Sequence, residues 1–340
     1  MKHLLNLDLD KFMAELEAVG QPGYRAKQIA EWVWHKGVCD FGQMSNLSPR
    51  LQGELAEHLC VLSGKVIHES RSDDDVMKLL IAFPDGQCVE CVLIPDGQRR
   101  TACLSTQVGC AMGCVFCASG LGGLGRNLTA GEIVEQIFHL QSACRERVSN
   151  VVLMGMGEPL ANYEATVSAI RAIVDPQRLG ISARRVTLST IGFPDLIRKL
   201  IAEDLPITLA ISLHAATDQL RRELIPAAGK TSIEDLIRAG REFFASRGRE
   251  LTLEYLLLAG VNDSLECARQ LGRLAGQLRC NVNLIRFNPV EGLDFRRPNE
   301  QAVRAFRDVL AKSGVNVHIR ASRGSNVQAA CGQLRRTALS

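Results

Sequence analysis

Three cysteines have a spacing that could build a metal site. Cys110, Cys114 and Cys117 follow the pattern C-x3-C-x2-C on a loop that contains glycines. Thiolates on such a loop can converge on one face of an iron–sulfur cluster. Three ligands leave one iron of a four-iron cluster open, and an open metal position is where a substrate can coordinate. A closed zinc site is the alternative: Cys103 or His139 could supply its fourth ligand, but no second ligand pair follows at the usual zinc spacing.

The other cysteines are interpreted through the compartment in which the chain works. No apolar run approaches the ~18–20 residues that span a bilayer, and Asp8 and Asp10 lie where a signal peptide needs apolar residues. We therefore expect a cytoplasmic protein with reduced thiols and no membrane segment. Seven of the twelve cysteines show no ligand spacing and are interpreted as core or surface thiols: Cys39, Cys60, Cys88, Cys91, Cys144, Cys267 and Cys280.

Positive charge is concentrated near the C-terminus, although the net charge of the 340 residues is only +3. Residues 296–336 contain nine Arg or Lys, and only Glu300 and Asp308 oppose them. A basic segment on a nearly neutral protein suggests that a polyanion docks on one face. A solvated surface helix is the alternative.

The pattern of apolar residues divides the chain into three parts. Residues 1–62 read as a small helical domain, in which Ile29, Trp32 and Val33 share one helical face. Residues 63–98 form a β-hairpin or linker region, because Pro-Asp-Gly-Gln occurs at 84–87 and again at 95–98. Residues 99–340 form the third part.

In residues 99–340, short apolar runs alternate with amphipathic stretches of helical length. Capping boxes at Thr129–Glu132 and Thr231–Glu234 open two of the helices. The expected strands lie at 100–105, 151–154, 186–189, 207–213, 251–258, 282–287 and 315–319. This alternation predicts an α/β fold with a parallel sheet, as a full or partial (β/α) barrel. Chemistry in barrels lies at the carboxyl ends of the strands, and the cysteine loop follows the first of them.

The cysteine loop in this position resembles the radical S-adenosylmethionine superfamily. The resemblance implies a partial (β/α)6-type barrel, a [4Fe–4S] cluster and S-adenosylmethionine bound at the open iron. Residues 154–159, Met-Gly-Met-Gly-Glu-Pro, follow the next strand and are similar to the superfamily's Gly-Gly-Glu element. Glycine permits close approach of the backbone to a ligand, and a carboxylate suits a cationic amine. Alone, Gly157, Glu158 and Pro159 would indicate an ordinary turn.

A narrower resemblance is to the RlmN/Cfr family of RNA adenine methyltransferases, over nearly the whole chain. It rests on residues 103–110 (Cys-Leu-Ser-Thr-Gln-Val-Gly-Cys), 212–215 (Ser-Leu-His-Ala) and 329–334 (Ala-Ala-Cys-Gly-Gln-Leu). Residues 23–29, 254–263 and 283–289 fit it too. The Ala-Cys-Gly-Gln-Leu element discriminates, because most radical S-adenosylmethionine enzymes lack it.

This resemblance implies roles for two further cysteines and one acid. Cys331 would carry a methyl group taken from a first cofactor molecule. A radical derived from a second cofactor molecule would activate that methyl group, which would add to the base. Cys103 would resolve the covalent adduct, leaving a thiol–thiol link that must be reduced, and Glu90 would accept a proton. The expected cofactor contacts are Gly157, Glu158, Ser189, Ser212, Leu213, His214 and Asn288.

The implied function is methylation of carbon 2 of an adenosine in 23S ribosomal RNA, and of the adenosine 3′ to a tRNA anticodon. Methylation of carbon 8 is the alternative. A glycyl-radical activating enzyme would need the cluster cysteines but would have no use for Cys103 and Cys331, and a zinc-containing RNA-binding module is a further alternative. The implied partners are the RNA and an electron donor of the flavodoxin or ferredoxin type, with the chain acting as a monomer.

Departures from the family pattern occur beside these motifs. Residues 226–230 lack the expected asparagine, paired basic residues and aromatic residue, and Arg286 stands where a proline is usual. Residues 325–327 replace an acidic pair, and residues 161–164 are altered. We expect a divergent branch with an intact chemical core, in which the RNA target and the target carbon are open.

Overall fold

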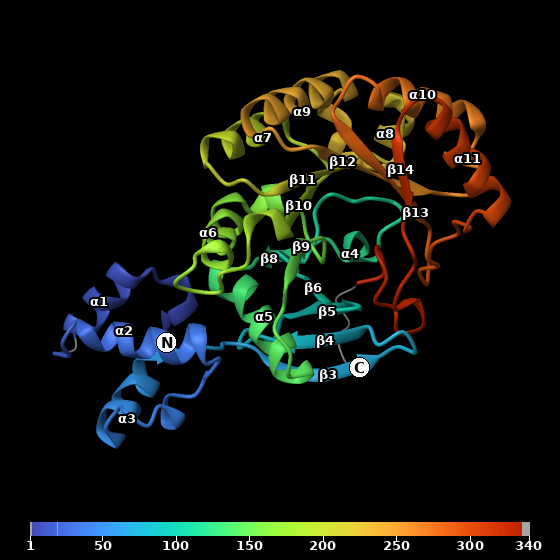
Figure 1. Ribbon diagram of the computed structural model, residues 1–340. Helices are drawn as coiled ribbons and strands as arrows, with labels where there is room; N and C mark the ends of the chain where they lie inside the picture. Colours follow the sequence, from blue (N-terminus) through green and yellow to red (C-terminus); the bar gives the residue numbers. More distant parts are fainter. Residues whose placement is uncertain (1, 19, 335–340) are drawn as a thin grey trace.

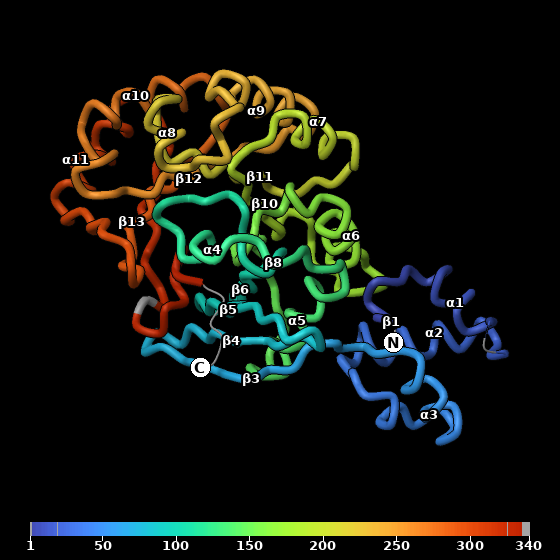
Figure 2. Tube along the Cα trace, turned by 180° about the vertical axis from the view of Figure 1, so that it is seen from behind, coloured from blue at the N-terminus to red at the C-terminus, as the bar shows by residue number. Residues whose placement is uncertain are grey.

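The computed structural model describes residues 2–18 and 20–334. A small group of helices near the N-terminus lies to one side of a larger α/β body (Figure 1; seen from behind in Figure 2). The two parts meet at helix α5 (Ala130–Cys144), where His3 Nε2 lies 2.9 Å from Glu135 Oε2 and the rings of Trp34 and Phe138 are 5.7 Å apart.

The N-terminal part packs its helices around a core of its own. Ile29 and Val33 are fully buried, as the sequence predicts, but Trp34 rather than Trp32 completes that face. The reason is a π-helical turn, η2, which rotates the chain after α2. Trp32 stays half-buried and its Nε1 donates to Asn46. The elements are β1 (Lys2–His3), η1 (Leu4–Asn6), α1 (Leu9–Ala18), α2 (Tyr24–Ala30), η2 (Glu31–His35), η3 (Phe41–Gln43), α3 (Pro49–His58) and β2 (Leu59–Cys60).

A ten-stranded sheet forms the body, in the order β14-β13-β12-β11-β10-β9-β6-β5-β4-β3. From β14 to β6 in this order, successive strands are parallel to one another, which confirms the predicted α/β fold with a parallel sheet. They are β6 (Arg99–Cys103), β9 (Asn150–Leu153), β10 (Val186–Thr190), β11 (Thr208–Ser212), β12 (Leu251–Leu257), β13 (Cys280–Arg286) and β14 (Asn316–Ile319).

The expected hairpin region continues this same sheet. Strands β3 (Lys65–Arg71), β4 (Met77–Ala82) and β5 (Cys88–Asp96) pair antiparallel in succession, and β5 pairs with β6. The turn at 84–87 connects β4 to β5, where the Asp-Gly signal predicts a hairpin. The first strand of the barrel therefore has a neighbour on both sides, which holds Cys103 inside the sheet.

Helices cover the outer face of the parallel strands (Figure 1). Thr129 and Glu132 form the predicted capping box of α5, whereas α9 begins one residue later than expected, because Ser232 caps it by accepting from the backbone of Asp235. The remaining helices are α6 (Tyr163–Val174), α7 (Pro194–Ala202), α8 (Asp218–Leu224), α9 (Ile233–Arg247), α10 (Leu265–Ala275) and α11 (Glu300–Lys312), with short turns η4 (Pro159–Asn162), η5 (Ala183–Arg185), η6 (Pro226–Lys230) and η7 (Ser325–Val327). In the described part of the chain, none of the helices combines the length and the apolar composition of a membrane span.

The segment 324–334 contacts the start of β4 and the helix after the cysteine loop. Lys78 Nζ donates to the carbonyl of Gln328 at 3.3 Å, and the backbone of Gly324 donates to Asp74 at 3.2 Å. Further along, Ser119 Oγ donates to the carbonyl of Leu334 at 2.6 Å. Lys78 is level with Cys103 across the sheet, because both pair with Val92, so these contacts bring the segment to the carboxyl end of β6.

Candidate active site

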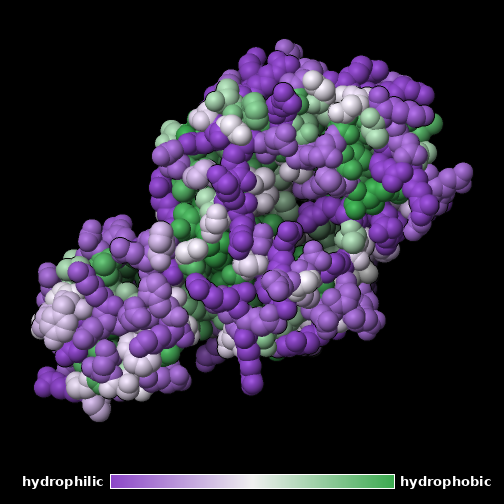
Figure 3. Space-filling model, in the orientation of Figure 1, coloured by the Kyte–Doolittle hydropathy of each residue, from purple (hydrophilic) through white to green (hydrophobic). Residues whose placement is uncertain are grey.

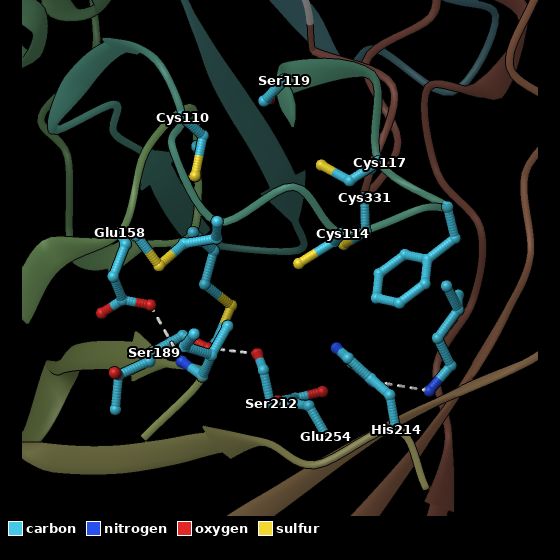
Figure 4. Close-up of a pocket in the computed structure, with 18 of the residues that line it drawn as sticks. Cys110, Cys114, Cys117, Ser119, Glu158, Ser189, Ser212, His214, Glu254 and Cys331 are labelled. Atoms are coloured by element: carbon cyan, nitrogen blue, oxygen red, sulfur yellow. Dashed lines mark hydrogen bonds between the residues drawn. The ribbon is translucent and has the colours of Figure 1, made fainter. Parts of the chain in front are cut away.

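The three motif cysteines lie on a loop between β7 (Gln107–Gly109) and α4 (Ala118–Leu121). Strand β8 (Leu124–Asn127) pairs with β7 and closes the loop. Gly109 has φ +74°, and an added Cβ would lie 2.0 Å from the carbonyl oxygen of Gly123, so this position accepts glycine alone. Figure 4 shows the three sulfur atoms directed toward a common space.

Burial makes this cysteine trio costly to ionise. It raises the pKa of Cys110 to about 11, and it also raises the pKa of Cys114 and Cys117, with the neighbouring thiolates adding to the effect at Cys110 and Cys114. Uncoordinated, these thiols are therefore protonated at neutral pH, and a cationic metal centre would offset the cost of the thiolates.

The sulfur arrangement differs from that of a site for one ion. Across residues 2–18 and 20–334, no three His, Cys, Asp or Glu side chains come close enough to bind a single metal. The cysteine sulfurs that bind a four-iron cluster lie farther apart than the ligands of a single ion, because each thiolate binds a different iron. His139, considered as a fourth zinc ligand, lines a different cavity beside Trp34 and Cys39. The convergence of three thiols from one short loop on a common space fits the donor set of such a cluster (Figure 4).

Glu158 follows β9 and is held by the backbone at its carboxylate. It is 3% exposed and accepts hydrogen bonds from the amides of Leu160 at 3.0 Å and Ile191 at 2.9 Å. Burial nevertheless raises the pKa of Glu158 to about 7. A ligand amine would find an acceptor here that is fixed in position and short of positive charge.

Position 157, just before Glu158, requires glycine for a different reason from the one that the sequence predicts. Gly157 has φ +101°, and an added Cβ would meet Cβ of Gln107 at 2.6 Å. Gln107 Oε1 in turn accepts from the amide of Glu158 at 2.8 Å. The glycine therefore lets the turn approach the chain's own cysteine loop, and this contact sets Glu158 against the cluster residues; the sequence predicts only close approach to a ligand.

Ser189 is next to the last residue of β10 and Ser212 is the last residue of β11, and their Oγ atoms are 3.2 Å apart. Both serines line a cavity of about 160 Å³ with Glu158 and the three cluster cysteines. Leu213, an expected cofactor contact, is 1% exposed and belongs to the core, and the lining of this cavity includes its neighbours Ser212 and His214 instead.

His214 is a neutral donor in the same cavity. Its Nδ1 accepts from the amide of Leu256 at 3.0 Å, so the ring proton lies on Nε2. Burial, with a contribution from the nearby Arg221 cation, lowers the pKa of His214 to about 3. The ring packs edge-on against Phe116, and Figure 4 shows it at the wall opposite Glu158.

Cys331 connects this cavity with a second one. It lies on the loop after η7, is exposed, and lines both the first cavity and an adjoining cavity of about 360 Å³. The adjoining cavity also contains Cys103 and Asn288. The amide of Ala118, next to Cys117, donates to the carbonyl of Gly332 at 2.8 Å and fixes the methyl-carrier candidate beside the cluster loop. The hollow near the centre of the face in Figure 3 lies in this region.

Cys103 is buried and lines the adjoining cavity together with Cys331. It is 9% exposed at the end of β6, and burial raises its pKa to about 12, with the Cys331 charge acting in the same direction and Arg320 opposing it. Asn288 is 2% exposed; its Nδ2 lies 3.5 Å from the carbonyl of Cys331, and its Oδ1 has no hydrogen-bond partner within the described chain.

Glu90 lies on β5, the strand that pairs with the strand of Cys103. The register pairs Val92 with Cys103, so Glu90, two residues away, points to the same face. It is 3% exposed and forms an ion pair with Lys78 at 2.8 Å. The lining of the two cavities, as described, does not include Glu90. Access from the cavities to this carboxylate would require the segment over it to shift.

Two charged residues in the cavities carry no role in the sequence-based site. Glu254, on β12, is 3% exposed; Asn283 donates to its Oε1 at 3.0 Å, and its Oε2 has no hydrogen-bond partner among residues 2–18 and 20–334. Arg320 follows β14, lies 3.7 Å from Glu254 and lines both cavities. Arg320 directly follows its strand, a position that could have indicated it from the sequence, whereas Glu254 lies within β12 and reaches the site because it pairs with Ser212, the last residue of β11.

The basic segment 296–336 is divided by the fold. Arg320 enters the site, Arg323 pairs with Asp96 at 3.0 Å, and Arg304 pairs with Glu300 at 3.1 Å. Arg296 and Arg297 are exposed, while Arg335 and Arg336 lie outside the described residues.

The comparisons with known proteins agree with this geometry. Residues 104–270 match the model of the radical SAM superfamily, and residues 2–61 match the ribosomal RNA large subunit methyltransferase N-terminal domain. A relative from Rhodopirellula baltica, named "Probable dual-specificity RNA methyltransferase RlmN", is 47% identical over 98% of this chain and 91% of its own. A relative of the same name from Thermotoga neapolitana is 42% identical over 98% of both chains.

A solved structure extends this agreement to the whole fold. The crystal structure of a radical SAM methyltransferase from Sphaerobacter thermophilus has a TM-score of 0.97 and 40% identity, and it covers 99% of this chain and 100% of that one. The aligned part of the chain includes the cysteine loop, the glycine–glutamate turn and the strand-end polar residues. The chain is a member of the radical SAM superfamily and, within it, of the RlmN family of RNA methyltransferases.

Proposed function

We propose that this RNA methyltransferase acts on carbon 2 of an adenosine in 23S ribosomal RNA, and also on the adenosine 3′ to a tRNA anticodon. The observation that carries the proposal is the position of Cys331, at the junction between the cavity of the cluster cysteines and the cavity of Cys103. The words "dual-specificity" in the names of the relatives support two RNA substrates.

A two-cysteine route suits this target because carbon 2 of adenine is not nucleophilic and cannot attack a methyl sulfonium. The enzyme uses a [4Fe–4S] cluster and S-adenosylmethionine, which together supply a methyl group and radical chemistry. In our proposal the Cys331 sulfur takes the methyl group by displacement and presents it to the base. Cys103 Sγ then bonds to Cys331 Sγ, the bond between Cys331 Sγ and the transferred carbon breaks with its electron pair staying on carbon, and Glu90 receives the proton from carbon 2. The disulfide so formed is reduced by an external thiol before the next turnover.

The strand-end residues would hold and orient the cofactor. Cys110, Cys114 and Cys117 would bind the cluster, and Glu158 would accept hydrogen bonds from the cofactor amine. The other expected contacts are Gly157, Ser189, Ser212, Leu213, His214 and Asn288. His214 Nε2 can donate but not accept, whereas Ser189 and Ser212 can do both, so the pocket offers mixed hydrogen-bonding to a nucleoside.

RNA docking is assigned to the basic C-terminal residues, including Arg335 and Arg336. Replacing both with Gln should weaken RNA binding and flatten its dependence on salt by up to about 0.7–0.9 log units per lost phosphate contact. If the dependence of binding on salt does not change, both arginines are solvated surface residues that do not contact RNA. We further propose that a low-potential flavodoxin- or ferredoxin-type protein supplies electrons and that the enzyme acts as a cytoplasmic monomer.

Nucleoside mass spectrometry tests the target carbon. Unmodified 23S ribosomal RNA and tRNA are incubated with cluster-loaded enzyme, cofactor and reductant, digested, and compared with 2-methyl- and 8-methyladenosine standards. We expect 2-methyladenosine from both RNAs. 8-Methyladenosine would favour the alternative carbon, and methylation of neither RNA would refute the proposed substrates.

A further inference from the structure

Arg221 of α8 is a buried cation without a paired anion. Its side chain is 1% exposed, and its Nη2 donates to the carbonyl of Ile191. Its Nε and Nη1 have no hydrogen-bond partner among the described residues, and among those residues no carboxylate forms an ion pair with it. Burying a charge in this state is costly, which points to a partner that the protein atoms alone do not provide.

The helix that carries Arg221 supports the cysteine loop directly. The amide of Val115 donates to the carbonyl of Leu224, the last residue of α8, at 3.1 Å. The amide of Ala227, in the following turn η6, donates to the carbonyl of Met112 at 3.3 Å. The two bonded loop residues, Met112 and Val115, lie on opposite sides of Cys114 in the sequence. The helix of Arg221 and the cysteine loop are therefore joined on both sides of this cysteine.

The charge of Arg221 reaches the cluster residues. Burial lowers the pKa of Arg221 to about 10, and the charges of Asp218 and Cys114 act against this shift. The guanidinium therefore remains positive at neutral pH. Its charge is also felt at His214, the neighbour of the cluster loop.

We propose that Arg221 is a positioning residue that stabilises the reduced iron–sulfur cluster and so raises its reduction potential. Reduction transfers one electron from an external low-potential electron carrier and neither forms nor breaks a bond to the protein. It makes the cluster and its thiolates more negative by one charge, and a fixed cation in a low-dielectric surrounding favours that state. The proposal rests on the family's cofactor and is independent of which RNA carbon is methylated.

A redox titration followed by electron paramagnetic resonance measures this potential without RNA. Arg221→Gln removes the buried charge, and Arg222→Gln is the matched control, because Arg222 is the next residue on the same helix and is exposed. At the potential that half-reduces the wild type, Arg221→Gln should lower the ratio of reduced to oxidised cluster at least about tenfold, which is about 59 mV for one electron. Arg222→Gln and Arg221→Lys should stay near the wild type.

A second variant, which keeps Arg221, tests the direction in which a nearby charge shifts the reduction potential. Asp218 opposes Arg221 from the same helix, so Asp218→Asn should raise the reduced fraction. The neutral Asn can still accept from the amide of Ile233, as Asp218 does at 2.7 Å. An Arg221→Gln protein with full iron content and the wild-type potential would overturn the proposal. If that variant does not hold iron, an unchanged or lower potential in Asp218→Asn would overturn it equally.

Discussion

The division of labour between Cys331 and Cys103 leads to a prediction about their reactivity. Cys103 is 9% exposed and has a pKa of about 12. At pH 7 this leaves a thiolate fraction of about 10⁻⁵, which rises about tenfold for each pH unit. Cys331 is exposed on the cavity wall. The methyl group should therefore be found on Cys331 alone, and Cys103 should react only once Cys331 has begun the chemistry.

Two substitutions separate these roles. Cys331→Ala should lose RNA methylation and the extra methylene on the peptide around residue 331, with no methylene appearing on Cys103. Cys103→Ala should still acquire the mark and still add to RNA, but resolution stalls, so covalently attached RNA accumulates. Peptide mass spectrometry detects the mark, and a nuclease-sensitive upshift on a denaturing gel detects the adduct.

A third cysteine, Cys267, provides a control for these two substitutions. Cys267→Ala changes a thiol on α10, outside both cavities, and should behave as the wild type. The effects of Cys331→Ala and Cys103→Ala should not add, because removing the carrier leaves nothing to resolve. Methylation by Cys331→Ala, a methylene found on Cys103, or RNA attached to the double variant would each refute the assignment.

Three further predictions concern the cluster, the cofactor and the fold. Anaerobically prepared protein should be brown with about four irons per chain, and Cys114→Ala should lose colour and activity together; one zinc and no iron in the wild type would contradict this. Because the pKa of Glu158 is about 7 and the amine needs a carboxylate, cofactor affinity measured by equilibrium dialysis should fall as the pH drops below about 7. The same raised pKa stabilises the ligand-free fold below the ordinary carboxyl pKa, and this stabilisation is lost as the pH rises through about 7. Glu158→Gln should bind weakly at every pH, and a wild-type affinity that does not change with pH would count against this role. Gly157→Ala should destabilise the protein by about 1–3 kcal/mol in denaturant unfolding, because of the Cβ contact with Gln107 and the positive φ. Gly53→Ala on α3, where no atom lies within 4 Å of the new Cβ, should instead stabilise it by about 0.5–1 kcal/mol; equal effects of the two substitutions would refute the steric argument.

Features of short range were predictable from the sequence. Cys110, Cys114 and Cys117 lie within eight residues, so their spacing alone indicates a shared centre, and the alternation of strands and helices predicts the parallel sheet. The capping box at Thr129 also formed as expected, since it depends only on residues within one turn.

Features that depend on what covers a side chain were decided by the tertiary structure. The sequence presents Arg221 and Arg222 as equivalent neighbours, but the fold buries the first under the cysteine loop and leaves the second in solvent. It likewise presents Arg320 as one of nine basic residues, whereas the end of β14 brings it to Glu254. Spacing and periodicity report only which groups are near in the chain. The charge state and exposure of a group depend on desolvation by residues far away in the sequence, and that is known only once the chain has folded.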